Sequence, residues 1–114
     1  MIPDLTIKAP NKLKEKTRID NKSVQILKIN DFEELEIWKS ARVLSKEVYL
    51  DFREHKDFGF RDQVQRCSVS VMNNIAEGFC RHGDKEFHHF LNIAKASCGE
   101  LKSMYYLAED IGYI

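Results

Sequence analysis

The chain has 114 residues, a mass of 13.4 kDa and 18 basic against 18 acidic side chains, so its formal net charge is zero. Its length fits one domain, and 43% hydrophobic with 32% charged residues excludes a disordered or a fibrous protein. The apolar runs are far shorter than the roughly 20 residues of a membrane helix, and Met1 to Asp4 do not begin a secretory signal, so we expect a cytoplasmic protein.

Residues 1–30 form a basic leader. It contains seven Lys or Arg residues and three acidic residues, which gives a net charge of +4, whereas the remaining residues carry a net charge of −4. The prolines and the scarcity of large apolar groups disfavour a stable helix, and Val24–Ile29 predicts a short extended segment. Such a leader is typical either of a solvated arm or of a nucleic-acid contact, for which the candidates are Lys8, Lys12, Lys14, Lys16 and Arg18.

A helical periodicity begins at Asp31 and predicts a first helix that runs to about Glu54, with Asp31 as its cap. Its apolar stripe contains Phe32, Leu35, Trp38, Ala41, Leu44, Val48 and Phe52. Gly59 and the residues before it predict a break, with Phe58 and Phe60 closing the end of the bundle.

A second helix is predicted by the apolar stripe of Val64, Cys67, Val71, Ile75 and Gly78. A polar stripe runs beside it, at steps of three and four residues: Gln63, Arg66, Ser70, Asn74 and Glu77. This stripe is either the solvent face of the helix or a polar network or subunit contact. The second interpretation is favoured by its mixture of both charges with short hydrogen-bonding groups.

The third helix is predicted to begin near Asp84 and to end before Gly112, a residue that accepts the left-handed conformation that closes a helix. Its apolar stripe contains Phe87, Phe90, Leu91, Ala94, Cys98, Leu101, Met104, Tyr105, Ala108 and Ile111. The small residues Ala94, Ala96, Ser97 and Gly99 predict a close helix contact in its middle.

No pattern of catalytic or cofactor-binding residues is evident. The potential metal ligands around the second turn have no known zinc spacing and are interpreted as a polar loop: Cys80, His82, Asp84, Glu86, His88 and His89. Cys67 and Cys98 lie on apolar stripes and are interpreted as small core residues. The aromatic residues have core spacing, and no phosphate-binding glycine motif occurs. We therefore expect no enzyme, no metal, no cofactor and no small-molecule substrate.

Several motifs occur together in one order. They are Phe32-x-x-Leu35-x-x-Trp38, then Gln63-x-x-Arg66-x-x-x-Ser70, then Asn74-Ile75-Ala76-Glu77-Gly78, and finally Glu86-Phe87-x-x-Phe90-Leu91-x-Ile93-Ala94-x-x-Ser97-x-x-Glu100-Leu101. In this order the chain resembles, from Phe32 to Ile114, the four-helix bundle proteins encoded in the 23S ribosomal RNA intervening sequences of bacteria.

The resemblance implies an antiparallel helical bundle that assembles into a ring-shaped homo-oligomer, typically a pentamer, without catalytic activity. A related group, the accessory proteins of diversity-generating retroelements, forms similar pentamers that bind nucleic acid. The polar positions that the resemblance implies are Gln63, Arg66, Ser70, Asn74, Glu77, Ser97 and Glu100. Family members usually continue into another amphipathic helix after the equivalent of Gly112–Ile114. We therefore expect an apolar groove that the leader or neighbouring subunits cover, or else that the chain is a fragment.

The sequence therefore predicts an all-α, antiparallel up-down bundle of three long helices over residues 31–114, of the four-helix type without its usual last helix. Residues 1–30 are predicted to be extended or flexible. The predicted function is that of a non-enzymatic homo-oligomer associated with ribosomal or other RNA through a basic surface. The alternative is a purely structural protein–protein interaction module that binds no nucleic acid.

Overall fold

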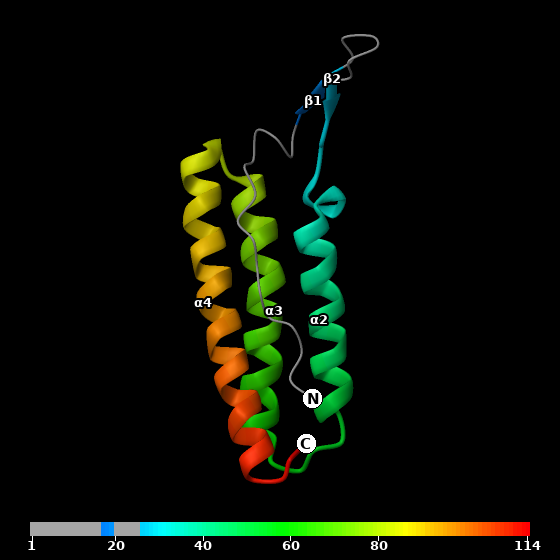
Figure 1. Ribbon diagram of the computed structural model, residues 1–114, viewed down its shortest axis with the longest axis vertical. Coiled ribbons are helices and arrows are strands. Elements are labelled where there is room, and N and C mark those ends of the chain that lie inside the picture. The colour runs from blue at the N-terminus through cyan, green and yellow to red at the C-terminus, as the bar shows by residue number, and fades with distance from the viewer. Residues whose placement is uncertain (1–16, 20–25) are drawn as a thin grey trace.

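The structure is a computed structural model, and it describes residues 17–19 and 26–114 (Figure 1). Its main body consists of the helices α2 (Glu36–Phe52), α3 (Phe58–Cys80) and α4 (Gly83–Asp110). Helix α3 lies between the other two, and the chain reverses direction at each of the two short turns that join them (Figure 1). The prediction of a helical body is confirmed.

A pair of short strands precedes the helices. Strand β1 (Thr17–Ile19) pairs antiparallel with β2 (Ile26–Lys28), so that Arg18 lies opposite Leu27. The extended segment predicted over Val24–Ile29 therefore contains a strand, and the strand pair precedes the all-α body that the sequence predicts.

The first helical segment begins later than predicted. The Asp31 carboxylate accepts a hydrogen bond from the Phe32 amide at 2.8 Å, but it caps a short 3₁₀ helix, η1 (Phe32–Glu34). Leu35 then adopts an extended conformation, and α2 starts at Glu36. Leu35 is fully buried, so the interruption places its side chain in the core. A continuous helix from Asp31 is therefore wrong.

The core consists of two clusters, each with residues from all three helices. The cluster near the α3–α4 turn contains Leu35, Ala41, Val71, Ile75, Phe79, Phe87, Leu91, Ala94 and Cys98. The cluster near the α2–α3 turn contains Leu44, Val48, Phe52, Val64, Cys67, Leu101, Tyr105 and Ala108. The predicted apolar stripes are thus largely confirmed as the core, but Ile111 is 49% exposed and Phe90 belongs to neither cluster.

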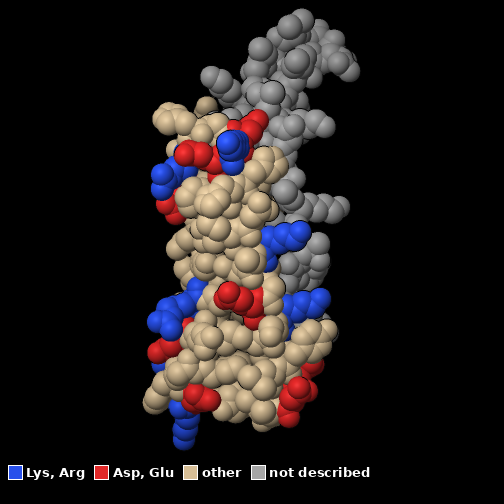
Figure 2. All heavy atoms as spheres, turned by 90° about the vertical axis from the view of Figure 1, so that its left-hand side faces the viewer, with Lys and Arg blue, Asp and Glu red and all other residues tan. Residues whose placement is uncertain are grey.

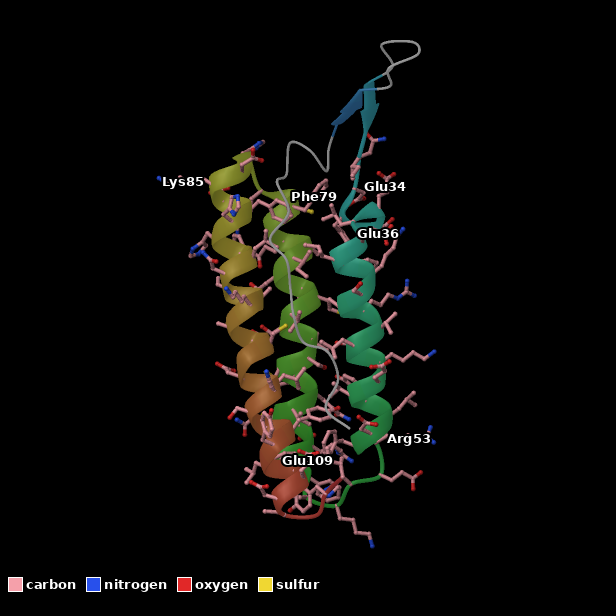
Figure 3. All side chains as sticks on the ribbon, viewed as in Figure 1. Glu34, Glu36, Arg53, Phe79, Lys85 and Glu109 are labelled. Carbon is pink, nitrogen blue, oxygen red and sulfur yellow. The ribbon has the colours of Figure 1, made fainter. Side chains whose placement is uncertain are left out.

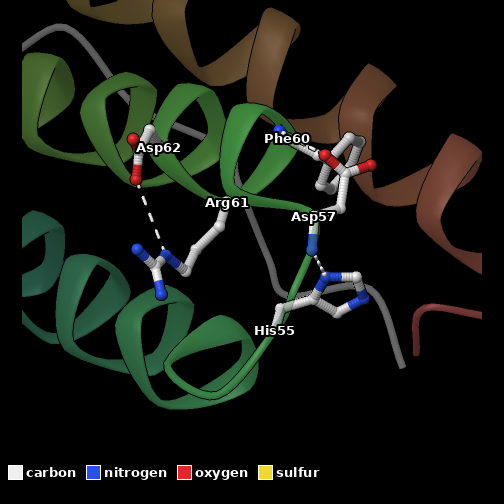
Figure 4. A network of polar contacts seen from close by, with 5 residues as sticks. All are labelled: His55, Asp57, Phe60, Arg61 and Asp62. Carbon is white, nitrogen blue, oxygen red and sulfur yellow. Dashed lines mark hydrogen bonds and ion pairs between the residues drawn. The ribbon is translucent and has the colours of Figure 1, made fainter.

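The turn between α2 and α3 is closed by Asp57, whose carboxylate accepts a hydrogen bond from the Phe60 amide at 3.1 Å (Figure 4). Helix α3 therefore begins at Phe58, and Gly59 lies in its first turn instead of in a break. Phe60 packs between Phe52 and Tyr113 and closes the end of the bundle as predicted. Phe58 does not, because it lies in the outward part of that turn and is 60% exposed.

Tyr113, which follows α4, contacts the turn between α2 and α3. The Tyr113 hydroxyl donates a hydrogen bond of 2.6 Å to the Asp57 carboxylate, and its ring lies 4.0 Å from the His55 ring. This bond, followed by the one from the Phe60 amide, lowers the pKa of Asp57. Gly112 has a φ of +77° and closes α4 in the left-handed conformation, as the sequence predicts.

Helices α3 and α4 approach each other closely at Gly78. A Cβ atom added at Gly78 would lie 2.6 Å from the Phe90 Cβ, whereas one added at Gly99 would meet nothing within 4 Å. Ala94 and Ser97 are buried, but Ala96 and Gly99 are exposed. The contact predicted from these small residues is therefore wrong for Ala96 and Gly99, because that side of α4 faces away from α3.

Candidate interaction surface

A chain of polar contacts joins α3 to α4. The hydroxyl oxygens of Ser70 and Ser97 are 2.9 Å apart, and the Asn74 amide donates to the Ser70 carbonyl at 2.8 Å and to its hydroxyl at 3.1 Å. The Cys67 thiol donates to the Ser97 carbonyl at 3.1 Å. We call Cys67, Ser70, Asn74 and Ser97 the α3–α4 polar seam.

The polar seam is compatible with burial because its groups are paired. Among the described residues, no buried side-chain nitrogen or oxygen lacks a hydrogen-bond partner. Burial of a polar group destabilises the folded state mainly when the group is unpaired, so hydrogen-bonded Ser and Asn side chains are tolerated between two packed helices. The polar network considered for the second helix therefore exists within one subunit, at Ser70 and Asn74.

The other predicted polar positions lie at the surface. Gln63, Arg66, Glu77 and Glu100 are exposed, and only Glu77 forms an ion pair with a described residue, with Arg81 at 2.9 Å. This pairing raises the pKa of the Arg81 guanidinium. The predicted site residues are thus divided, since Ser70 contacts both Asn74 and Ser97, whereas the four longer side chains are exposed.

Helix α4 carries a second periodic row, of which the predicted core stripe contains only Met104 and Ile111. Beside its core stripe, side chains at steps of four and three residues form what we call the α4 outer row: Ile93, Ser97, Glu100, Met104, Leu107 and Ile111. Steps of four and three keep a row turned toward a second helix, as in coiled coils. The sequence does not present it as one row, because Ser97 and Glu100 interrupt its apolar character.

The α4 outer row is apolar and largely open to solvent. Ile93, Leu107 and Ile111 are 36%, 49% and 49% exposed. The row adjoins the polar seam, because Ser97 belongs to both and a Glu100 carboxylate oxygen lies 3.8 Å from the Cys67 sulfur. Figure 2, which faces α4, shows mostly uncharged side chains on this side of the molecule.

The cysteine side chains fall into two kinds, since Cys67 and Cys98 are buried and Cys80 is exposed. Burial raises the pKa of both Cys67 and Cys98 to about 11, so both thiols are protonated at neutral pH. The residues around the second turn are exposed, namely Cys80, His82, Asp84, Glu86, His88 and His89. No three metal-binding side chains converge in residues 29–114.

The basic residues proposed for nucleic-acid contact in the leader fall largely beyond the described residues. Lys8, Lys12, Lys14 and Lys16 lie outside them, and Arg18 lies in β1, where the structure describes the backbone alone. Within the described segments, none of the helices has the length and apolar character needed to cross a bilayer.

A sequence model of the family described as 23S rRNA-intervening sequence protein matches residues 33–114, which include all three helices. The chain belongs to this family. Comparisons with curated proteins and with solved structures return no match. Within this member of the 23S rRNA-intervening sequence protein family, the match covers the polar seam and the α4 outer row and does not include the leader.

Proposed function

We propose that the protein is a non-enzymatic module that assembles with copies of itself through the α4 outer row and associates with RNA through basic surface. The exposed row of Ile93, Leu107 and Ile111 carries the proposal. Surface rows of aliphatic side chains beside polar groups are typical of protein interfaces. The three helices then form an antiparallel bundle of the four-helix type, and the resemblance favours a ring of five subunits.

Charge at the edge of the polar seam favours a copy of this chain as the partner. Arg66 of α3 forms no ion pair with a described residue, and Glu100 of α4 is exposed nearby. A face that carries both an available cation and an available anion can pair with itself in a symmetric or ring arrangement. A formal net charge of zero also avoids strong repulsion between identical subunits.

The RNA part of the proposal rests on two observations. The family is described by its connection with 23S rRNA intervening sequences, and the leader carries a net charge of +4. Lys and Arg side chains that neutralise phosphates release counterions, so such binding weakens as salt increases. An RNA titration at several salt concentrations tests this part. Absent or salt-independent binding would leave the purely structural module.

The assembly part is tested by a pair of matched double variants whose native mass is measured by light scattering. Ile93→Glu with Leu107→Glu places two charges in the α4 outer row and is expected to reduce the mass to 13.4 kDa. Val43→Glu with Leu50→Glu changes two aliphatic side chains of α2 that are 55% and 51% exposed, and it is expected to leave the mass unchanged. Equal masses for the two double variants would refute assembly through α4.

A further inference from the structure

Helix α2 separates its charged side chains onto two sides. At about 100° per residue, its basic residues fall within an arc of about 60°, here called the basic arc. This arc contains four exposed side chains: Lys39, Arg42, Lys46 and Arg53. The acidic residues of the helix fall within another arc of about the same width, which contains Glu36, Glu47 and Asp51. Val43 and Leu50 lie between the two arcs.

The two arcs face different parts of the molecule. Asp51 accepts a hydrogen bond of 2.7 Å from the Tyr105 hydroxyl, which places the acidic arc on the side where α2 meets α4. Figure 3 shows nitrogen-tipped side chains that project from α2 away from the other helices, with Arg53 at the lower end. The basic arc is therefore an outer surface of the subunit, remote from the α4 outer row.

Most cations of the basic arc have no anionic partner. In the described part of the chain, Arg42, Lys46 and Arg53 lie within 4.0 Å of no carboxylate, and Lys39 pairs only with the exposed Glu36 at 3.4 Å. Arg42 lies over the Trp38 ring, 5.7 Å from its centroid, which leaves its charge without an anionic partner. Clustered cations of this kind on one helix face produce a positive potential that attracts a polyanion. An acidic protein could respond to the same potential, but a regular phosphate backbone fits a straight row better.

The dimensions and the neighbouring aromatic side chain favour a single strand. Lys39 and Arg53 are separated by 14 residues of helix, or about 21 Å, so the row can follow several phosphates of one strand. Tyr49 lies at the edge of the basic arc and is 43% exposed. Surfaces that bind single strands combine cations for the backbone with aromatic rings on which bases stack.

We infer that the basic arc of α2 is the docking surface for an unpaired RNA strand, with Lys39, Arg42, Lys46 and Arg53 on its phosphates and Tyr49 stacked on a base. This inference rests on the proposed association with RNA. It assigns that association to a helix face of the described body in addition to the leader.

The test compares two triple variants of equal charge change in the full chain. Arg42→Gln with Lys46→Gln and Arg53→Gln removes three cations of the basic arc. Lys85→Gln with Lys95→Gln and Lys102→Gln removes three exposed cations of α4 and serves as the control. Binding of a labelled single-stranded RNA of about 12 nucleotides is measured by fluorescence anisotropy between about 50 and 200 mM salt. Thermal melts establish that both variants fold.

The expected result follows from counterion release. Each phosphate contact with a single strand contributes about 0.7 to the slope of log affinity against log salt, so the α2 variant should lower the slope by about 2. Its affinity should fall on the order of 100-fold near 0.1 M salt. The α4 control should keep the wild-type slope. Tyr49→Ala alone should weaken binding at least about fivefold without changing the slope.

The other outcomes separate the two proposals. If the wild-type protein binds the RNA and the α2 variant keeps its salt slope, the α2 assignment is overturned and the association with RNA stands. If the α2 and α4 variants lose the same slope, the effect is one of net charge, which also overturns the assignment. Tighter binding of a matched duplex overturns the single-strand assignment. If the wild-type protein binds neither RNA, the RNA part of the proposed function fails as well.

Discussion

The substitution Gly78→Ala tests the packing of α3 against α4 most sharply. The added Cβ would lie 2.6 Å from the Phe90 Cβ and 3.1 Å from the Phe87 Cδ1, well inside the usual separation of about 3.5–4.0 Å between carbon atoms. The Phe90 Cβ is attached directly to the backbone of α4. The clash therefore cannot be relieved by rotating a flexible side chain, and the two helices must move apart.

The magnitude follows from two opposed effects. Overpacking of a close contact costs about 1–3 kcal/mol, and separating the helices also stretches the 2.9 Å contact between Ser70 and Ser97. In the opposite direction, alanine in place of glycine inside a helix raises the free energy of unfolding by about 1 kcal/mol. We expect Gly78→Ala to lower the free energy of unfolding by about 1–2 kcal/mol.

Gly99→Ala is the matched control, because Gly99 is also inside a helix but its added Cβ would meet nothing within 4 Å. It should raise the free energy of unfolding by about 0.5–1 kcal/mol. Both variants are measured by urea denaturation followed by circular dichroism, at one protein concentration because assembly also contributes to stability. A Gly78→Ala protein that is as stable as the Gly99→Ala protein would refute the close approach of α3 and α4.

Three further predictions concern side chains in the core and at the turns. Tyr105→Phe should lower the free energy of unfolding by about 1–2 kcal/mol in urea denaturation, because the bond to Asp51 is lost while the buried ring remains, and an unchanged stability would contradict that bond. A thiol assay near neutral pH should modify only the exposed Cys80 in the native protein and all three cysteines in urea. The reason is that burial raises the pKa of both Cys67 and Cys98 to about 11. Rapid modification of either buried cysteine in the native protein would contradict its burial. The pKa of Asp57 is lower in the folded than in the unfolded state, so the ionised carboxylate stabilises the fold. This stabilisation is fully present above the unfolded-state pKa of about 3.9 and is lost as the pH falls through the folded-state pKa. The urea midpoint of the wild type should therefore fall more steeply below about pH 4 than that of Tyr113→Phe, and parallel curves would exclude the contribution of Tyr113.

The helices and their buried faces could be predicted from the sequence because apolar residues recur with the helical period. Val64, Val71 and Leu101 are all fully buried. The helix starts were less predictable, because they depend on tertiary contacts. Asp31 has the side chain of a cap, but the burial of Leu35 ends the first turn and moves the start of α2 to Glu36.

The candidate surface was only partly predictable. Spacing placed Ser70 and Asn74 on one stripe with Arg66, but it could not show that Ser70 and Asn74 are half-buried while Arg66 is exposed. The contact of Ser97 with Ser70 joins residues 27 positions apart, which helix periodicity alone does not pair. Gly78 and Gly99 look alike in sequence, and only the arrangement of α3 and α4 distinguishes the close contact from the open face.

The native mass of the full chain in solution tests the central claim, self-assembly, most directly. Light scattering should give a multiple of the 13.4 kDa subunit mass, and a ring of five subunits corresponds to about 67 kDa, five times 13.4 kDa. The same mass should persist over a range of protein concentrations above the dissociation constant. A mass of 13.4 kDa at the highest soluble concentration would contradict the assembly of this protein through the α4 outer row.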